Sequence, residues 1–289
     1  MARAEPMAAA HPLRARFLYG ALIVGALAAL LVVDRLIGNP LFFSLVALAA
    51  IVLSIGEFGS IVRASGARFD GAPVAFYAAA LVALKVPALV PRSVIPAPGP
   101  ELLVLAVMVL HLVARSVVSG DVEGAIRRLG ADVLAYVWLV LGLSAFLDIL
   151  AGYGVGTTLA AIAVAKSHDI GALLVGRSLG RRKLAPKVSP NKSVEGAIGG
   201  VLLSLVAAGL SALLLEAPAI AGPRFLLFGF VVSLAAMLGD LVESLVKRDA
   251  GVKDSAGWIP GFGGVLDMTD SLTLAGPVAL ATLAGLARI

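Results

Sequence analysis

Nine runs of mostly apolar residues divide this chain, and most are long enough to cross the roughly 30 Å hydrocarbon layer of a bilayer as a helix. They lie at 17–37, 40–56, 72–90, 99–118, 131–150, 155–176, 194–215, 223–246 and 270–288. With 60% hydrophobic and 14% charged residues, the chain also lies outside the composition of soluble domains. We therefore expect an all-α polytopic integral membrane protein with about nine transmembrane helices.

The lysine and arginine residues are distributed unevenly among the loops that join these runs. If the chain crosses the membrane nine times, most of them lie on the side of the N-terminus. The opposite side holds Arg35, Lys85, Arg92, Arg224 and Arg288. Because basic residues collect in cytoplasmic loops, this pattern predicts a cytoplasmic N-terminus. The net charge of +5 is then attributed to topology and to contact with anionic lipid, and we expect no nucleic-acid partner.

The distribution of polar residues predicts three parts. Residues 1–16 form a cytoplasmic tail, and residues 17–150 form five helices that act as a scaffold, shape a lipid cavity and offer a dimer contact. Residues 151–289 form the catalytic region, whose polar loops 177–196 and 247–269 face the cytoplasm together. Little in the first four runs resembles chemistry. The chain has no cysteine, so a metal ion would have to bind oxygen or histidine ligands.

The segment 239–271 carries an unusual density of charge for a membrane protein. Ionisable residues are costly in hydrocarbon, so such a cluster indicates a functional site. Several of its polar residues share one face of a predicted helix at the spacing i, i+3, i+4, i+7 and i+8, namely Asp240, Glu243, Ser244, Lys247 and Arg248. Lys253, Asp254 and a glycine-rich stretch follow, and then Asp267 and Asp270 lie at i, i+3 where the last apolar run begins.

A second polar segment precedes the seventh run. Lys166 and Asp169 interrupt the sixth run, and they can act at a site or simply neutralise each other. The basic loop 177–196 can likewise be a cytoplasmic anchor. Its later half is more specific, because Ser189 followed by proline predicts a helix start with serine as the cap. The free N–H groups of that helix start, together with Lys192 and Ser193, would suit a phosphate.

Several carboxylates beside lysine and arginine residues, without cysteine, indicate hard divalent cations that bridge carboxylate and phosphate oxygens. Mg²⁺ fits this description, since proteins usually hold it with one or two carboxylates and the phosphates of a substrate. Two metal positions, or one metal with basic side chains, would stabilise a phosphoryl centre and a pyrophosphate leaving group. The expected substrate is a polyphosphate that meets a lipid at the bilayer surface.

The residues 244–270, SLVKRDAGVKDSAGWIPGFGGVLDMTD, resemble the signature of the phosphatidate cytidylyltransferases, also called CDP-diacylglycerol synthases. The upstream residues 169–196, DIGALLVGRSLGRRKLAPKVSPNKSVEG, resemble the same family. The resemblance implies a dimeric enzyme of the bacterial-type inner membrane with its active site facing the cytoplasm. It also implies a Mg²⁺-dependent transfer of CMP from CTP to phosphatidic acid, with release of pyrophosphate.

Carried over position by position, the resemblance makes Asp240 and Asp267 the leading metal ligands, with Asp254 and Asp270 in support. The implied catalytic residues are these four aspartates and Lys247. The implied substrate-binding residues are Lys192, Ser189, Ser193, Glu195, Ser244, Arg248, Lys253 and Asp169.

Three positions depart from the family pattern. Phe262 stands where the family usually has histidine, Met268 where it has arginine, and Leu173 where an aromatic residue is common. Because the carboxylates are retained, we expect a divergent but active member. Two alternatives stay open: a CTP-dependent transferase for an isoprenoid or other lipid, and an ion-coupled transporter that uses Lys166, Asp169 and Asp240. The clustering of charge at one membrane face and the absence of a repeat disfavour the transporter.

Overall fold

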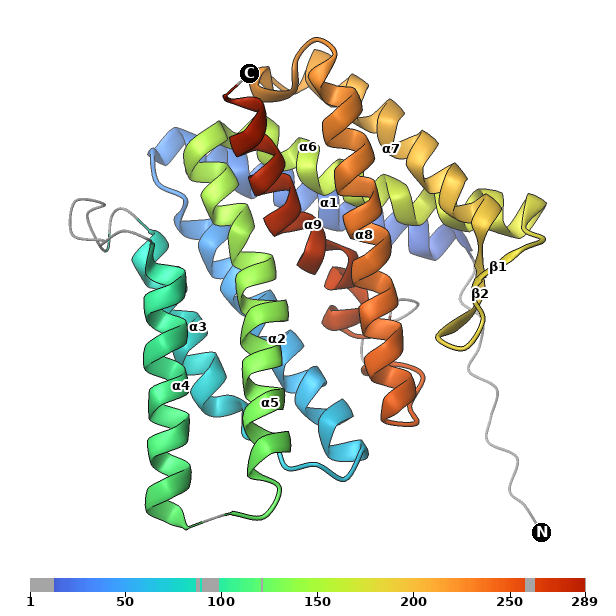
Figure 1. Ribbon diagram of the computed structural model, residues 1–289. Helices are drawn as coiled ribbons and strands as arrows, with labels where there is room; N and C mark the ends of the chain where they lie inside the picture. The colour runs from blue at the N-terminus through green and yellow to red at the C-terminus, as the bar shows by residue number, and fades with distance from the viewer. Residues whose placement is uncertain (1–12, 87–88, 90–98, 121, 258–262, 289) are drawn as a thin grey trace.

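A computed structural model describes the backbone of residues 13–86, 89, 99–120, 122–257 and 263–288, with side chains from residue 25 onward (Figure 1). The helices are α1 (Leu13–Ile37), α2 (Leu41–Ala64), α3 (Gly71–Lys85), α4 (Pro100–Ser119), α5 (Ala125–Ala135), α6 (Leu141–Leu179), α7 (Val194–Leu214), α8 (Arg224–Asp249) and α9 (Val265–Leu286). A π-helical turn, Tyr136–Val140, joins α5 to α6, and a short 3₁₀ turn, Pro218–Ile220, precedes α8. Two short strands, β1 (Lys183–Ala185) and β2 (Ser189–Ser193), form an antiparallel hairpin.

The prediction of an all-α polytopic membrane protein is confirmed. Within the described residues, six helices are long and apolar enough to cross a membrane. They are α2, α4, the helical segment Ala125–Leu179, α7, α8 and α9. Each of the nine predicted apolar runs lies mainly on a helix, but α3 is shorter than a usual span. The number of nine spans and the cytoplasmic N-terminus therefore stay predictions.

The runs 131–150 and 155–176 lie on the helical segment Ala125–Leu179, which is broken at Gly154 into two helices. This residue has φ 81° and ψ 178°, a conformation that favours glycine because it has no Cβ. Figure 1 shows the chain turning there, so that the second part of α6 runs beside α7. Glycines allow this close packing, because a Cβ at Gly171 would meet the backbone of Gly199.

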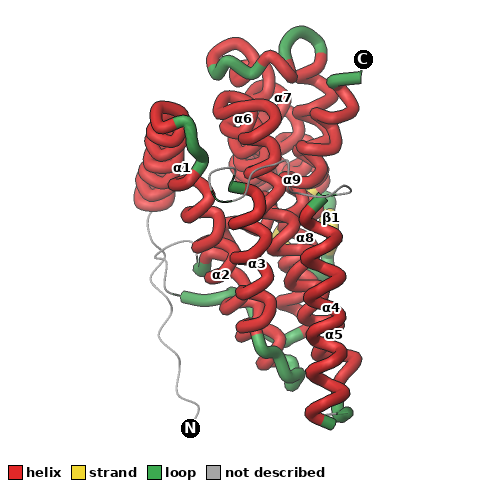
Figure 2. Tube along the Cα trace, turned by 90° about the vertical axis from the view of Figure 1, so that its left-hand side faces the viewer, coloured by secondary structure: helices red, strands yellow, loops and turns green. Residues whose placement is uncertain are grey.

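The loops fall on two sides of the helix assembly. In Figure 1 the connections α2–α3 and α4–α5, the end of α8 and the β1–β2 hairpin lie toward the lower side, whereas the connections α1–α2 and α7–α8 lie in the upper part. Figure 2 shows α1 at one edge, next to the bundle that the other helices form. The described parts of the polar loops 177–196 and 247–269 lie toward the lower side, and that this side faces the cytoplasm stays a prediction.

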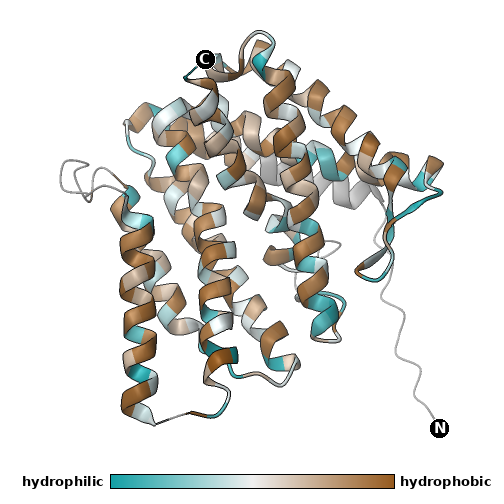
Figure 3. Cartoon of the chain, viewed as in Figure 1, coloured by the Kyte–Doolittle hydropathy of each residue, from teal (hydrophilic) through white to brown (hydrophobic). Residues whose placement is uncertain are grey.

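The outward faces of the helices are apolar, as Figure 3 shows by the brown colour along them. On α4, for example, Leu110 and Val117 are 70% and 74% exposed. Such a surface is suited to lipid rather than to water. One buried charge among these helices is doubly paired: Lys85 Nζ lies 2.6 Å from Asp148 Oδ2 and 2.9 Å from Glu101 Oε1, which ties α3, α4 and α6 together.

Candidate active site

Three carboxylates from α8 and α9 meet where these helices pack most closely. Asp240 and Glu243 lie one turn apart on α8, and Asp270 lies on α9. One oxygen from each lies within 4.8 Å of the other two. The side chains of Glu243 and Asp270 are buried, and Asp240 is partly exposed. The close approach depends on Gly239, because a Cβ there would collide with the backbone carbonyl of Asp270.

Two lysines pair with members of this acidic centre, and a third lysine pairs with the neighbouring Asp169. Lys247 Nζ lies 3.0 Å from Glu243 Oε2 and 2.7 Å from Asp267 Oδ1. Lys192, on β2, places its Nζ 2.7 Å from Asp240 Oδ2. Lys166 Nζ lies 3.0 Å from Asp169 Oδ2. These pairings explain how several charged groups are tolerated among apolar helices, since each of the three lysines has a carboxylate beside it.

Ser271 links the Lys166 pair to α9. Its hydroxyl accepts a hydrogen bond from Lys166 Nζ at 2.7 Å and donates one to Asp169 Oδ2 at 2.9 Å. Lys166 and Asp169 therefore do more than neutralise each other, because they hold α6 against the residue that follows Asp270.

Asp267 is separate from the three-carboxylate centre. Its Oδ2 accepts hydrogen bonds from the Ser255 hydroxyl at 2.6 Å and from the Gly264 N–H at 2.8 Å. Its Oδ1 faces Lys247, which bridges it to Glu243. The residues that the structure groups around a common point are thus Asp240, Glu243 and Asp270, whereas Asp267 fixes the start of α9 and reaches the centre through Lys247.

Glu57 was missed by the sequence analysis, which found little chemistry in the first four apolar runs. Its buried carboxylate, on α2, accepts hydrogen bonds from the backbone N–H groups of Val265 at 2.9 Å and Leu266 at 2.8 Å. It also accepts one from the Ser255 hydroxyl at 2.9 Å. Glu57 thus satisfies the open N–H groups at the start of α9. The signal was available, because an isolated glutamate within an apolar helix is itself unusual.

A cleft of about 580 Å³ opens beside Asp240, between α6, the hairpin, α7 and α8. Its polar lining comes from the two segments that the sequence singled out. The predicted site residues among the lining are Asp169, Ser189, Lys192, Ser193 and Asp240. His168, Arg177 and Asn191 add further polar groups. The cleft is within the size range of ligand sites and mixes an acidic end with basic walls.

The predicted helix start at Ser189 was wrong. Ser189–Ser193 is a strand that pairs with Lys183–Ala185, so α7 begins at Val194 and its cap is Ser193. The Ser193 hydroxyl accepts a hydrogen bond from the Gly196 N–H at 3.1 Å. The neighbouring Glu195 accepts hydrogen bonds from the backbone N–H groups of Arg181 and Arg182, and so orders the entry to the hairpin. The pairing of β2 with β1 therefore determines the conformation of Ser189–Ser193, rather than the local tendency of Ser189 to cap a helix.

Four predicted site residues lie in the last two turns of α8 and in the loop that follows it. Arg248, Lys253 and Asp254 are exposed, and Ser244 is partly buried. Within the described residues, Asp254 and Lys253 form no ion pair with each other or with the centre. Of the two departures in the last motif, Met268 is partly buried on α9, and Phe262 lies outside the described residues.

The arrangement defines a class of protein: an integral membrane protein in which carboxylates and lysines converge beside a cleft, an arrangement suited to a phosphate ester and a divalent cation. The comparisons with known proteins agree. A sequence profile of the Cytidylyltransferase family matches residues 14–286, so the chain belongs to that family.

Two bacterial relatives named phosphatidate cytidylyltransferase illustrate the similarity. The one from Bacillus subtilis is 41% identical over 152 residues, which is 52% of this chain and 56% of the relative. The one from Haemophilus influenzae is 50% identical over 113 residues, which is 38% of this chain and 39% of the relative. An uncharacterized protein from Escherichia coli, YnbB, is 38% identical over 175 residues, 58% of each chain. The chain thus spans about half the length, or less, of the curated relatives it matches.

Proposed function

We propose that this chain is a phosphatidate cytidylyltransferase, which forms CDP-diacylglycerol and pyrophosphate from CTP and phosphatidic acid. The observation that carries the proposal is the convergence of Asp240, Glu243 and Asp270 with Lys192 and Lys247 beside a cleft in a member of the cytidylyltransferase family. A phosphate oxygen of phosphatidic acid attacks the α-phosphorus of CTP. The bond to the bridging oxygen breaks, and pyrophosphate leaves with its electron pair.

The residues present fit a magnesium ion. Asp240, Glu243 and Asp270 offer only oxygen ligands, and Glu243 Oε1 is buried without a hydrogen-bond partner. An oxygen in that state is destabilising unless a cation or donor meets it. We propose that these three residues hold Mg²⁺, with Asp267 and Asp254 supporting it or a second metal position. When bound, Mg²⁺ would neutralise phosphate oxygens and make the α-phosphorus more electrophilic.

The lysines and the hairpin would bind the phosphates. Lys192 stands at the boundary between the cleft and the carboxylate centre, where its ammonium group can move from Asp240 to a triphosphate oxygen over a short path. Ser189 and Ser193 lie on the same strand, and Ser244, Arg248 and Lys253, at the end of α8 and beyond it, would bind or orient the phosphates. Lys247 would hold Glu243 and Asp267 in position rather than bind substrate, because both neighbours are carboxylates.

The surroundings of the cleft support a lipid acceptor. Part of its wall is apolar, formed by Ala172, Leu173 and Ala197. The adjoining outer faces of α6 and α7 expose large apolar side chains, including Leu174 at 54% and Leu202 at 59%. A lipid can therefore lie along these helices with its phosphate in the cleft. We further propose that the chain works as a homodimer in the inner membrane. The cleft would face the cytoplasm, an orientation that the distribution of basic residues supports.

The test is a transfer assay with the purified full chain in mixed micelles, labelled CTP and Mg²⁺. We expect labelled CDP-diacylglycerol and equimolar pyrophosphate with phosphatidic acid as acceptor, and neither without acceptor. Parallel reactions contain a polyprenol, a polyprenyl phosphate, or ATP, GTP or UTP in place of CTP. Transfer to the isoprenoid lipids alone would overturn the proposal in favour of a different lipid acceptor. Turnover with every nucleotide would overturn the assignment of CTP.

A further inference from the structure

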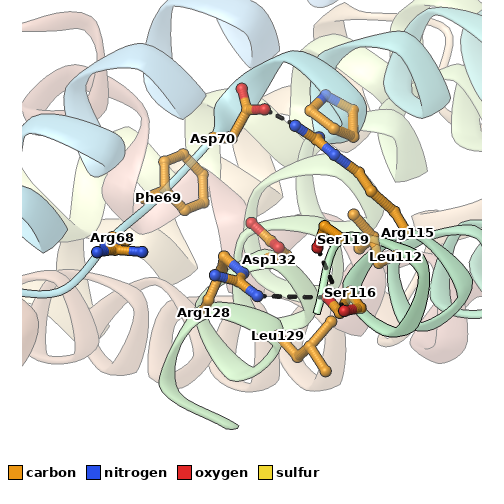
Figure 4. Close-up of a pocket in the computed structure, with 11 residues that line it drawn as sticks. Arg68, Phe69, Asp70, Leu112, Arg115, Ser116, Ser119, Arg128, Leu129 and Asp132 are labelled. Atoms are coloured by element: carbon orange, nitrogen blue, oxygen red, sulfur yellow. Dashed lines mark hydrogen bonds and ion pairs between the residues drawn. The ribbon is translucent and has the colours of Figure 1, made fainter. Parts of the chain in front are cut away.

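A second cavity lies toward the same lower side of Figure 1 as the hairpin, but near α3, α4 and α5, and it shares no lining residue with the cleft. Its volume is about 300 Å³, and it lies between the α2–α3 connection, the end of α4 and the start of α5 (Figure 4). Three arginines line it: Arg68, Arg115 and Arg128. Nothing in the proposed transfer reaction uses this cavity.

The arginines give the cavity an electrostatic preference for an anion. The lining holds these three arginines and two carboxylates, Asp70 and Asp132, so positive charge is in excess and favours an anion that enters the cavity. Arg115 pairs with Asp70 at 3.0 Å, but both side chains are at least half exposed, and such pairs contribute little stability. A guanidinium has five N–H donors in a planar fork, a shape that matches the oxygens of a phosphate. The hydroxyls of Ser116 and Ser119 lie at the same cavity.

Asp132 provides a second and independent observation. Its side chain is 3% exposed, and its Oδ1 has no hydrogen-bond partner. Figure 4 shows the carboxylate directed toward the space between Phe69 and Ser119. A buried acceptor without a donor is destabilising, so the cavity favours a ligand that carries a hydroxyl or ammonium donor as well as an anion.

The position of the cavity indicates a lipid. Leu112 and Leu129 form part of its wall, and α4 leads into it with an outer face on which Leu110, Val113 and Val117 are exposed. Acyl chains can lie along that face while the headgroup enters the cavity. A soluble phosphate would gain nothing from this apolar approach.

We propose that this cavity binds the headgroup of a phospholipid, with the phosphodiester at Arg68, Arg115 and Arg128 and a terminal hydroxyl or ammonium group at Asp132. The occupant is thus an ordinary membrane phospholipid and not the phosphomonoester substrate, because a phosphomonoester has no headgroup beyond its phosphate that could carry a separate hydroxyl or ammonium donor to Asp132. The binding does not depend on the transfer reaction, so the two proposals fail separately.

The test is native mass spectrometry of the purified full chain titrated with phosphatidylglycerol. Arg128→Gln is compared with Arg127→Gln, which removes the same charge from the adjacent, exposed residue that does not line the cavity. We expect Arg128→Gln to weaken one binding event at least tenfold and Arg127→Gln less than twofold. Equal effects of the two variants on phosphatidylglycerol binding would overturn the proposal that this cavity is the binding site. Arg115→Gln, whose side chain is 55% exposed, gives the same comparison if Arg128→Gln does not fold.

Two further experiments test whether Asp132 binds a donor group of the lipid headgroup, and whether the phosphate in the cavity belongs to a lipid or to a soluble compound. Phosphatidylmethanol has the same charge as phosphatidylglycerol but no hydroxyl, so we expect it to bind more weakly. Asp132→Asn should reduce this preference, and equal binding of the two lipids to the unmodified chain would overturn the role of Asp132. Glycerol 3-phosphate and inorganic phosphate serve as soluble competitors. Displacement of the lipid by either at equal concentration would show that the cavity takes a free phosphate rather than a lipid.

Discussion

Glu57 and Asp267 share the hydroxyl of Ser255, which lies 2.9 Å from the first carboxylate and 2.6 Å from the second. A hydroxyl has one proton, so it can donate to only one of them at a time. The two acids come from α2 and α9, which are more than two hundred residues apart in sequence. Together they bind the N–H groups of Gly264, Val265 and Leu266 and so fix where α9 begins.

We predict that Glu57→Gln lowers transfer activity roughly 10- to 100-fold, the usual effect of changing a group that orients metal ligands. The amide keeps the shape of the side chain but turns one acceptor into a donor that faces backbone N–H groups. The start of α9 then shifts, and Asp270 shifts with it. The measurement is the Mg²⁺ dependence of the rate together with Mn²⁺ affinity by electron paramagnetic resonance.

The control for this variant is Glu123→Gln, which removes an exposed carboxylate between α4 and α5. It should leave both the rate and the Mn²⁺ affinity unchanged. If Glu57→Gln lowers thermal stability alone and leaves the metal affinity intact, Glu57 is a structural cap without influence on the site.

The sequence predicted the helices well, because apolar runs of membrane length leave few alternatives. It also predicted that two segments about fifty residues apart form one site, and Lys192 on β2 does contact Asp240 on α8. It did not predict which carboxylates group together. That depends on how closely α8 and α9 approach, and on the contact of Glu57 with the start of α9. The start of α7 was misplaced because strand pairing across the hairpin is not a local signal.

We predict that Gly239→Ala abolishes activity and lowers the apparent Tm. A Cβ at this position would collide with the Asp270 carbonyl, so α8 and α9 would have to move apart. Overpacking of this kind costs about 1–3 kcal/mol. The matched control is Gly285→Ala on α9, where a Cβ would meet nothing within 4 Å. That variant should keep full activity and the same or a higher Tm, since alanine favours helix by roughly 0.5–1 kcal/mol. Equal Tm values for the two variants would contradict the close-packing argument.

We predict that Asp240→Asn, Glu243→Gln and Asp270→Asn each weaken Mn²⁺ binding at least tenfold and abolish transfer, because each removes a charged oxygen ligand from the same centre. Asp267→Asn should weaken binding less, since its oxygens are occupied by Lys247, Ser255 and Gly264. The control is Asp249→Asn at the exposed end of α8. An ordering in which Asp267→Asn has the largest effect on metal affinity would place the metal at Asp267 instead.

We predict that Lys192→Gln raises the KM for CTP roughly 10- to 100-fold, the equivalent of the about 1.5–3 kcal/mol that a hydrogen bond to a charged group contributes. Lys192 is the cation that borders both the cleft and Asp240, so its loss removes a phosphate partner and leaves Asp240 with one fewer counter-ion. Lys187→Gln is the matched control, because Lys187 is exposed in the same hairpin. It should leave the KM within twofold. Lys192→Arg keeps the charge and should recover part of the affinity. If Lys192→Gln lowers kcat without changing the KM, Lys192 positions Asp240 and does not bind the nucleotide.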